Sequence, residues 1–500
     1  MAFFIFGGVS MSLINVQNLS FSYEGNPDLI FDNVSLKLDT KWKLGFIGRN
    51  GRGKTTFLKL LKREYTYQGN ISSSVNFDYF PFEVLDKSLN IIGIFQNISS
   101  EIVKWQIQRE LSLLSVSSEI LYMPFNNLSS GEQTKILLAA LFLKPNNFLL
   151  IDEPTNHLDL EARKVVTEYL QGKSGFILVS HDRHILDNCV DHILSINKTN
   201  IELQKGNFSS WWHNKNLRDQ YEKEENEKLQ DTISKLTESS KRTLNWSDKV
   251  EKTKFGNGPV DRGYIGHKAA KMMKRSKTIE QRREKAIEEK QKLLKNIEKS
   301  EALAIKPQSH HKNLLAEASS LSISYGHRVI FRDLNFFIYQ GQRVALQGKN
   351  GSGKSSILKV LLGENIQYDG TFKIASNLKI SYVPQDTSFL KGDLKDFAYE
   401  RGIDETLFKT ILRKFGFSRE QFKKEISIFS EGQKKKILIA GSLCEKAHLY
   451  VWDEPLNFID VISRIQIEEL LLKYKPTMIF VEHDISFVEN VATDFIKLMD

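Results

Sequence analysis

Short apolar runs recur along both halves of the chain, each set among polar residues. A run of roughly four to eight apolar residues is typical of a buried strand, whereas apolar residues at helical spacing indicate a helix. The strand-like run LGFI precedes the helix-like FLKLL, and VALQ precedes ILKVL, each time across a glycine-rich loop. Further strand-like runs are FLLI, LYVW, GFILVS and MIFVE. The pattern predicts an α/β fold in both halves.

The two halves also repeat one another. The segment GRNGRGKTT begins at Gly48 and GKNGSGKSS begins at Gly348, and further matching segments follow in the same order at offsets of 300 to 302 residues. Such a repeat indicates duplicated domains. The predicted divisions are a first domain over 1–212, with Met11 as an alternative start, an interdomain linker over 213–310, and a second domain over 311–500.

The interdomain linker carries a helical pattern in two stretches. Apolar residues recur at helical spacing over 213–245 and again over about 267–304. Between them, several glycines and Pro259 interrupt any continuous helix. The pattern predicts a long antiparallel helical hairpin whose tip lies at about 244–277.

Positive charge is concentrated at this predicted tip. The net charge of the 500-residue chain is +9, and residues 241–283 alone hold 13 Lys and Arg against 4 Asp and Glu. Cationic side chains interleaved with aromatic ones suit folded RNA with unstacked bases. The alternative is a solvated coiled-coil surface. The candidate RNA contacts are Trp246, Lys252, Lys254, Phe255, Arg262, Tyr264, Lys268, Lys271, Lys274, Arg275 and Lys277.

Composition argues against several classes of protein. Apolar runs such as ILLAALFL fall short of the roughly 18 to 20 residues that span a bilayer, so no membrane domain is expected. Cys189 and Cys444 lie in different halves without a pairing pattern, which fits a reducing cytosol. The sequence has no zinc-type cysteine clusters, so we expect neither a DNA-repair ATPase nor DNA as a partner.

Each half contains a glycine-rich loop between a strand-like and a helix-like run. Both loops fit the pattern G-x-x-x-x-G-K-[ST], in which backbone N–H groups surround phosphates and the lysine reaches the β- and γ-phosphates. Thr55 and Ser355 would hold Mg²⁺. One such match alone can be accidental, but two in matching contexts indicate nucleotide binding. The loop residues are Gly48, Asn50, Gly51, Gly53, Lys54, Thr55, Thr56, Gly348, Asn350, Gly351, Gly353, Lys354, Ser355 and Ser356.

A pair of carboxylates ends one apolar run in each half. Buried carboxylates are costly unless they serve a metal and a water. Asp152 and Asp453 therefore suit a Mg²⁺ role, and Glu153 and Glu454 suit the general base that positions the attacking water. The alternative is a pair of helix N-caps before proline. Two further pairs recur, with a γ-phosphate contact expected for His181 and His483 and adenine stacking for Tyr23 and Tyr325.

These elements, in this order, resemble the ATP-binding cassette (ABC) superfamily. Two cassettes in one chain and a charged linker are similar to the ABC-F subfamily, whose members act on the ribosome. The segments FIGRNGRGKTT, LIDEPTNHLDL, KRSK and VWDEPLNFID resemble the Lsa-type resistance members. The resemblance implies tandem P-loop ABC ATPase domains that use ATP and Mg²⁺. It also implies a cytoplasmic protein that protects the bacterial ribosome against lincosamides, streptogramin A and pleuromutilins, contacting rRNA and tRNA near the peptidyl-transferase region.

The resemblance further implies that the cassettes pair head to tail, with each ATP between the phosphate loop of one cassette and the signature segment of the other. The signature residues are Ser129, Ser130 and Gly131 in the first cassette and Ser430, Glu431 and Gly432 in the second. Gln385 matches the family's Q-loop glutamine, another Mg²⁺ ligand, but Phe82 stands at the matching position of the first cassette. Glu431 likewise replaces a small glycine. We therefore expect unequal sites, the first hydrolysing ATP more slowly.

Two other functions remain open. A housekeeping ABC-F translation factor would share the ATPase machinery and differ at the linker tip. An ATPase subunit of a membrane exporter would need separate membrane partners, and the fused cassettes and basic linker disfavour it.

Overall fold

The structure is a computed structural model that describes residues 13–25, 29–156, 158–197, 199–252, 274, 281, 285, 307–326 and 328–498. The chain divides into two compact units. One comprises Met1–Ser209 with Glu301–Asp500, and the other comprises Ser210–Ser300. The first unit therefore holds both halves of the sequence repeat, which we call the first cassette (up to Ser209) and the second cassette (from Glu301).

The first cassette contains a six-stranded sheet and a three-stranded antiparallel sheet. The larger sheet has the order β5-β6-β7-β3-β8-β9 and is parallel except for its last strand. Its strands are β3 (Lys43–Ile47), β5 (Asn76–Phe80), β6 (Asn147–Asp152), β7 (Phe176–Val179), β8 (His192–Asn197) and β9 (Asn200–Lys205). The smaller sheet has the order β2-β1-β4, from β1 (Leu13–Phe21), β2 (Phe31–Asp39) and β4 (Gln68–Ser73).

Helices connect and cover these strands. The helices of the first cassette are α1 (Lys54–Leu61), α2 (Ile91–Ile98), α3 (Lys104–Leu113), α4 (Ser130–Phe142), α5 (Leu160–Gln171) and α6 (Arg183–Cys189), with short 3₁₀ turns η1 (Ser118–Tyr122) and η2 (Phe125–Asn127). Because β3, β6 and β7 are buried along nearly their whole length, they carry the continuous apolar runs that predicted them.

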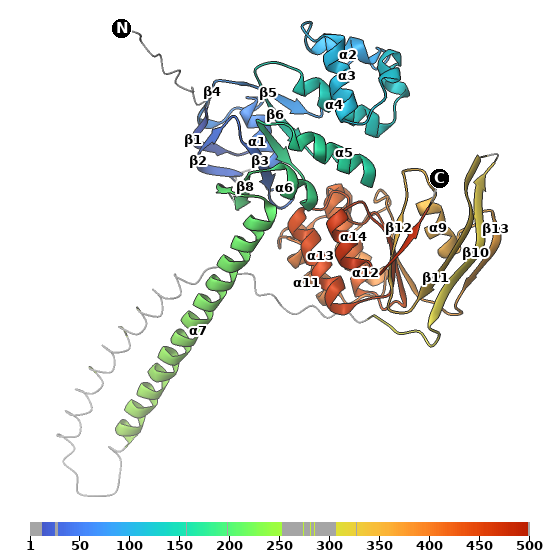
Figure 1. Cartoon of the computed structure of the whole chain (residues 1–500). Coiled ribbons are helices and arrows are strands. Elements are labelled where there is room, and N and C mark those ends of the chain that lie inside the picture. The colour runs from blue at the N-terminus through green and yellow to red at the C-terminus, as the bar shows by residue number, and fades with distance from the viewer. Residues whose placement is uncertain are drawn as a thin grey trace, which may run out of the picture. The chain divides into compact units, whose positions relative to one another are not determined.

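The second cassette repeats this plan. A parallel sheet has the order β14-β15-β16-β12-β17, and an antiparallel one has the order β11-β10-β13. The strands are β10 (Leu314–Tyr325), β11 (Arg328–Tyr339), β12 (Arg343–Gln347), β13 (Tyr368–Ile374), β14 (Ile380–Val383), β15 (Leu449–Asp453), β16 (Met478–Val481) and β17 (Asp494–Lys497). Within this cassette, α11, α12, α13 and α14 lie on one side of β12, and α9 with the antiparallel sheet lies on the other (Figure 1).

The helices of the second cassette follow the same order as those of the first. They are α9 (Lys354–Leu361), α10 (Leu394–Glu400), α11 (Glu405–Lys414), α12 (Glu431–Cys444), α13 (Val461–Tyr474) and α14 (Ile485–Val491), with 3₁₀ turns η4 (Gln421–Lys423) and η5 (Ile426–Ile428). Together the two cassettes confirm the predicted tandem α/β domains.

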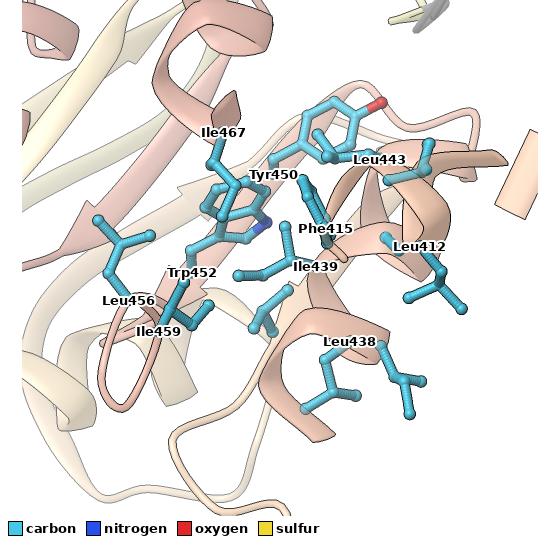
Figure 2. Packing of buried hydrophobic residues seen from close by; sticks show 14 of the residues in the cluster. Leu412, Phe415, Leu438, Ile439, Leu443, Tyr450, Trp452, Leu456, Ile459 and Ile467 are labelled. Atoms are coloured by element: carbon cyan, nitrogen blue, oxygen red, sulfur yellow. The ribbon is translucent and has the colours of Figure 1, made fainter. Parts of the chain in front are cut away.

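The core of the second cassette packs its helices onto β15. Figure 2 shows Trp452 and Tyr450 of β15 beside Ile439 of α12, with Leu456 and Ile459 from the loop that follows β15. All five side chains are at most 1% exposed. Burying an apolar side chain this completely stabilises the fold by about 1.5–3 kcal/mol. The loop after β15 is therefore fixed to the core.

A single helix, α7 (Phe208–Lys252), enters the linker. At its start, the Asp187 carboxylate accepts hydrogen bonds from the Ser209 amide and hydroxyl, both at 2.7 Å. The sequence placed the end of the first arm near residue 245, but the helix continues to Lys252, because no glycine or proline interrupts the sequence before Gly256. The described helices include none that is long and apolar enough to cross a membrane.

Candidate active site

The phosphate loops precede α1 and α9 in the predicted way. Gly53 and Gly353 have φ values of 95° and 93° just before their helices. A Cβ at Gly53 would lie 2.6 Å from Ile30, so only glycine fits this turn. The Lys54 ammonium donates to the Gly48 carbonyl at 2.8 Å, and Lys354 makes the same bond to Gly348 at 2.7 Å. Both lysines are thus held at the loop where phosphates would bind.

The residues expected to hold Mg²⁺ lie together in both cassettes. The Thr55 hydroxyl donates to Asp152 Oδ2 at 2.8 Å, and Ser355 forms a hydrogen bond with Asp453. Asp453 Oδ1 is buried and has no hydrogen-bond partner among the described residues. Hydroxyl and carboxylate oxygens are the ligands that Mg²⁺ prefers. The oxygen atoms available in each cassette therefore fit a Mg²⁺ ion.

The candidate general bases stand next to the candidate switch histidines. His181 Nε2 lies 3.4 Å from Glu153 Oε1, and His483 Nε2 lies 3.5 Å from Glu454 Oε1. Both glutamates have left-handed backbone, with φ values of 52° and 45°. Such strained conformations cluster at functional sites, where the surrounding structure maintains them.

The two bases differ in their electrostatic surroundings. Burial and the neighbouring Asp152 carboxylate raise the pKa of Glu153 to about 8, even though Lys54 acts in the opposite direction. Burial alone would also raise the pKa of Glu454, but the neighbouring His483 ring and the amide hydrogen bonds from Gln385 and Asn457 outweigh it, and the pKa falls to about 2. Glu153 is therefore protonated near neutral pH, whereas Glu454 is ionised.

An amide donor contributes to this difference. Gln385 Nε2 donates to Glu454 Oε2 at 2.9 Å, and Asn457 Nδ2 donates to the same oxygen at 2.6 Å. In the first cassette Phe82 occupies the position that matches Gln385 and offers no donor. Burial also lowers the pKa of His181 well below its usual value, with the Lys54 charge acting in the same direction.

Two cavities combine residues of both cassettes. The first nucleotide site is a cavity of about 560 Å³, and the second is a cavity of about 410 Å³. The predicted residues that line the first are Tyr23, Asn50, Gly51, Gly53, Lys54, Thr55, Thr56, Asp152, Glu153, His181, Ser430, Glu431 and Gly432. Those that line the second are Ser130, Tyr325, Asn350, Gly351, Gly353, Lys354, Ser355, Ser356, Gln385, Glu454 and His483. Gly48, Gly348, Asp453, Ser129 and Gly131 are not among the lining residues.

The first nucleotide site is tightly packed where the cassettes meet. Asn50 Nδ2 of the first cassette donates to the Phe458 carbonyl of the second at 2.6 Å. A Cβ at Gly432 would lie only 2.3 Å from that carbonyl oxygen and 2.9 Å from Asn50 Nδ2. At the matching Gly131, the nearest atom would lie 3.4 Å away, on Leu158. Glycine is therefore required for close approach at the first site.

An ion pair also joins the cassettes. The Arg183 guanidinium of α6 pairs with the Glu468 carboxylate of α13, and both side chains are largely buried. Glu468 also accepts a hydrogen bond from Asn490 at 2.8 Å. A buried pair of this kind fixes the register of two surfaces.

The two predicted adenine-stacking tyrosines are partly exposed. Tyr23 is 40% exposed and Tyr325 is 51% exposed. Their hydroxyls form hydrogen bonds with Thr56 at 2.8 Å and Ser356 at 3.1 Å, so each ring is held beside its phosphate loop. Adenine stacking stays a prediction.

Sequence reasoning missed several residues at these sites. The Tyr79 hydroxyl donates to Asp152 Oδ2 at 2.8 Å. The Lys436 ammonium of the second cassette lies 2.5 Å from Asp460 Oδ2, and both are buried. The Asp460 carboxylate acts electrostatically on Lys54 of the first cassette. The repeat could have revealed Asp460, because Asp159 stands at the matching position and acts on Lys354 in the same way.

Comparison with known proteins agrees with this geometry. The family model described as ABC transporter matches residues 31–156 and 331–457, one match in each cassette. The chain belongs to this ATP-binding cassette family. This ABC protein is a P-loop ATPase, because both matches carry the phosphate loop and the carboxylate pair.

Several characterised proteins resemble this ABC protein over most of its length. The ribosome protection protein VmlR of Bacillus subtilis is 29% identical over 489 residues, covering 94% of this chain and 84% of VmlR. The ATP-binding protein Uup of Buchnera aphidicola is 28% identical, covering 96% and 80%. The solved archaeal ribosome recycling factor aABCE1 shares the fold, with a TM-score of 0.61, 18% identity, and coverage of 96% of this chain and 87% of that one.

The predicted RNA contacts lie in the linker, where little is described. Trp246 and Lys252 belong to the backbone of α7, and Lys274 is helical and exposed. The remaining candidates lie outside the described residues, namely Lys254, Phe255, Arg262, Tyr264, Lys268, Lys271, Arg275 and Lys277.

Proposed function

We propose that this ABC protein is an ABC-F ATPase that binds the bacterial ribosome and releases it after ATP hydrolysis. The observation that carries this proposal is the construction of two nucleotide sites from both cassettes of one chain, joined by a linker with a strongly basic segment. The relative named a ribosome protection protein matches 94% of the chain, linker included, which supports the ribosome as the partner. In this view the protein works in the cytoplasm.

ATP acts as the bridge between the cassettes. In the first nucleotide site, Lys54 and the loop amides bind the phosphates, and Ser430 and Gly432 of the second cassette complete the cavity. Thr55 with Asp152, and Ser355 with Asp453, would hold Mg²⁺, which supplies charge neutralisation of the phosphates. Glu153 and Glu454 accept a proton from the attacking water, with His181 and His483 beside them.

The two sites hydrolyse ATP at different rates. A general base must be ionised to accept a proton, and Glu454 meets this condition at neutral pH better than Glu153 does. Glu431 adds a carboxylate to the first nucleotide site, where the γ-phosphate would also bring negative charge. Hydrolysis at the second site is therefore the faster event.

The basic linker segment contacts ribosomal RNA. Chemical probing of rRNA bases near the peptidyl-transferase region tests whether the segment extends to that region. If the protein is a resistance factor, this contact displaces lincosamides, streptogramin A and pleuromutilins. If it is a housekeeping translation factor, it has the same ATPase activity but does not displace these drugs. Alanine at Trp246, Phe255 and Tyr264 separates the two, since resistance lost with ATPase activity retained supports a role for the linker tip in protection.

Cosedimentation tests the ribosome proposal directly. The double variant Glu153→Gln, Glu454→Gln binds ATP but lacks both bases, so it should stay on ribosomes when ATP and Mg²⁺ are present. The matched control is Lys54→Ala, Lys354→Ala, which loses the phosphate contacts and should remain in the supernatant. Failure of the trapped variant to sediment with ribosomes contradicts the proposal, as does equal sedimentation of both variants. Sedimentation with membrane vesicles in place of ribosomes supports the exporter alternative.

A further inference from the structure

The loop after β15 reaches from the core of the second cassette to the first nucleotide site. We call residues 456–460 the second D-loop. Its Leu456 and Ile459 side chains are fully buried beside Trp452 (Figure 2). Its Phe458 carbonyl accepts the hydrogen bond from Asn50 of the first cassette. Any shift of this loop therefore moves a group that touches the phosphate loop of the opposite cassette.

A buried carboxylate holds this loop to the strand that carries the switch histidine. Glu482 directly follows β16 and is 4% exposed. Its Oε1 accepts the Leu456 amide at 2.6 Å, and its Oε2 accepts the His483 amide at 3.0 Å. The Arg464 guanidinium compensates the charge electrostatically and also donates to the Ile459 carbonyl at 2.9 Å. One side chain thus joins His483 to the second D-loop.

The described residues of the first cassette form no matching hydrogen bond. Ser180 occupies the matching position, and its hydroxyl accepts the Asp182 amide at 3.1 Å. The amide that matches Leu456 belongs to Thr155, and a serine side chain is two atoms shorter than a glutamate. The arginines that brace the loops do occur in both cassettes, since Arg163 Nε donates to the Leu158 carbonyl at 3.0 Å. The two cassettes thus share the arginine contact and differ in the carboxylate.

A buried carboxylate is a costly way to hold a loop. Removing a charge from water is unfavourable unless several hydrogen bonds and a counter-charge offset it. The first cassette shows that a serine suffices for the fold at this position. Glu482 therefore points to a task that Ser180 does not perform.

We propose that Glu482 is a positioning residue that transmits the state of the second nucleotide site to the phosphate loop of the first. The proposal rests on the assignment of His483 and Glu454 to the second site. The path runs from His483 through Glu482 to Leu456, and from Phe458 to Asn50. Asn50 Oδ1 in turn accepts a bond from the Lys54 ammonium at 3.4 Å. Among the described residues, Ser180 forms no hydrogen bond to the Thr155 amide, so the link through a side chain at this position is described in the second cassette alone.

Single-site variants measure this coupling. In Glu454→Gln the second site retains ATP without hydrolysing it, and in Lys354→Ala it is empty. The ratio of first-site ATP turnover between these two backgrounds is the coupling ratio, which reports how strongly the second site controls the first. We expect a ratio of at least about fivefold in the otherwise native chain. Adding Glu482→Ser, which copies the first cassette, should bring the ratio to within about twofold.

The controls separate coupling from simple loss of structure. A merely structural role for Glu482 lowers turnover in both backgrounds equally and leaves the ratio unchanged, which overturns the proposal. The matched variant Ser180→Ala should keep the native ratio. Glu482→Gln keeps an acceptor for the Leu456 amide and should give an intermediate ratio, so it serves if the serine variant does not fold. A coupling ratio near one in the chain with native Glu482 also overturns the proposal.

Failure of the underlying site assignment looks different. In that case neither Glu153→Gln nor Glu454→Gln reduces total ATP turnover. If both glutamine variants lose turnover but Glu482→Ser leaves the coupling ratio unchanged, only the coupling proposal is refuted.

Discussion

The unequal acidities of Glu153 and Glu454 predict different pH profiles for the two nucleotide sites. In Glu454→Gln, turnover reports the first site alone. With the pKa of Glu153 at about 8, the carboxylate is about 10% ionised at pH 7 and about 90% ionised at pH 9. Since only the ionised form accepts a proton from water, kcat/KM should rise about ninefold between these pH values.

Steady-state phosphate release at constant ionic strength and saturating Mg²⁺ provides the assay. The kcat/KM profile reports the free protein, whereas the kcat profile reports the nucleotide complex. Mg²⁺ beside Asp152 neutralises one of the causes of the raised pKa, so the inflection in kcat should lie at lower pH than the inflection in kcat/KM.

The complementary variant is the control. In Glu153→Gln, turnover reports the second site, where the pKa of Glu454 is about 2 and the base is ionised at every pH from about 6 to 9. Its profile should be flat over this range. A flat profile for both sites refutes the reasoning from burial and Asp152. An equal rise in both points to a shared step rather than to Glu153.

Two further substitutions test the packing and the metal geometry of the first site. Gly432→Ala places a Cβ 2.3 Å from the Phe458 carbonyl and should cost about 1–3 kcal/mol of closure, lowering first-site turnover at least about fivefold. In Gly131→Ala the new Cβ would lie 3.4 Å from its nearest neighbour, on Leu158, so this variant should have a smaller effect on second-site turnover. Equal losses of turnover in the two variants contradict the packing argument. Tyr79→Phe removes a donor to Asp152 and should raise the Mg²⁺ concentration for half-maximal first-site turnover roughly tenfold. An unchanged Mg²⁺ requirement assigns Tyr79 to stability alone.

The phosphate loops were predictable because their chemistry is local. The spacing of Gly48, Gly53 and Lys54 requires a left-handed turn before a helix, and this turn forms from consecutive residues. Tyr79 could not be found in this way. It reaches Asp152 because β5 pairs with β6, and one sequence does not state which strands are neighbours.

Glu482 escaped notice for a related reason. Its neighbour His483 was selected because His181 repeats it, and a search for repeated residues passes over the positions at which the copies differ. The end of α7 was misjudged on other grounds. The apolar spacing that predicted the first arm was followed over 213–245 only, but the residues that come next do not interrupt a helix as glycine or proline does.

The ion pair between Arg183 and Glu468 has a consequence for the two halves as products of gene duplication. Ile485 occupies the position that matches Arg183, and Thr167 the position that matches Glu468. A homodimer of first cassettes would set a buried guanidinium against threonine, and a homodimer of second cassettes would set a buried carboxylate against isoleucine. Each leaves a charge without its partner, which typically costs about 3–5 kcal/mol. The two halves are therefore complementary, and neither can take the place of the other without this cost.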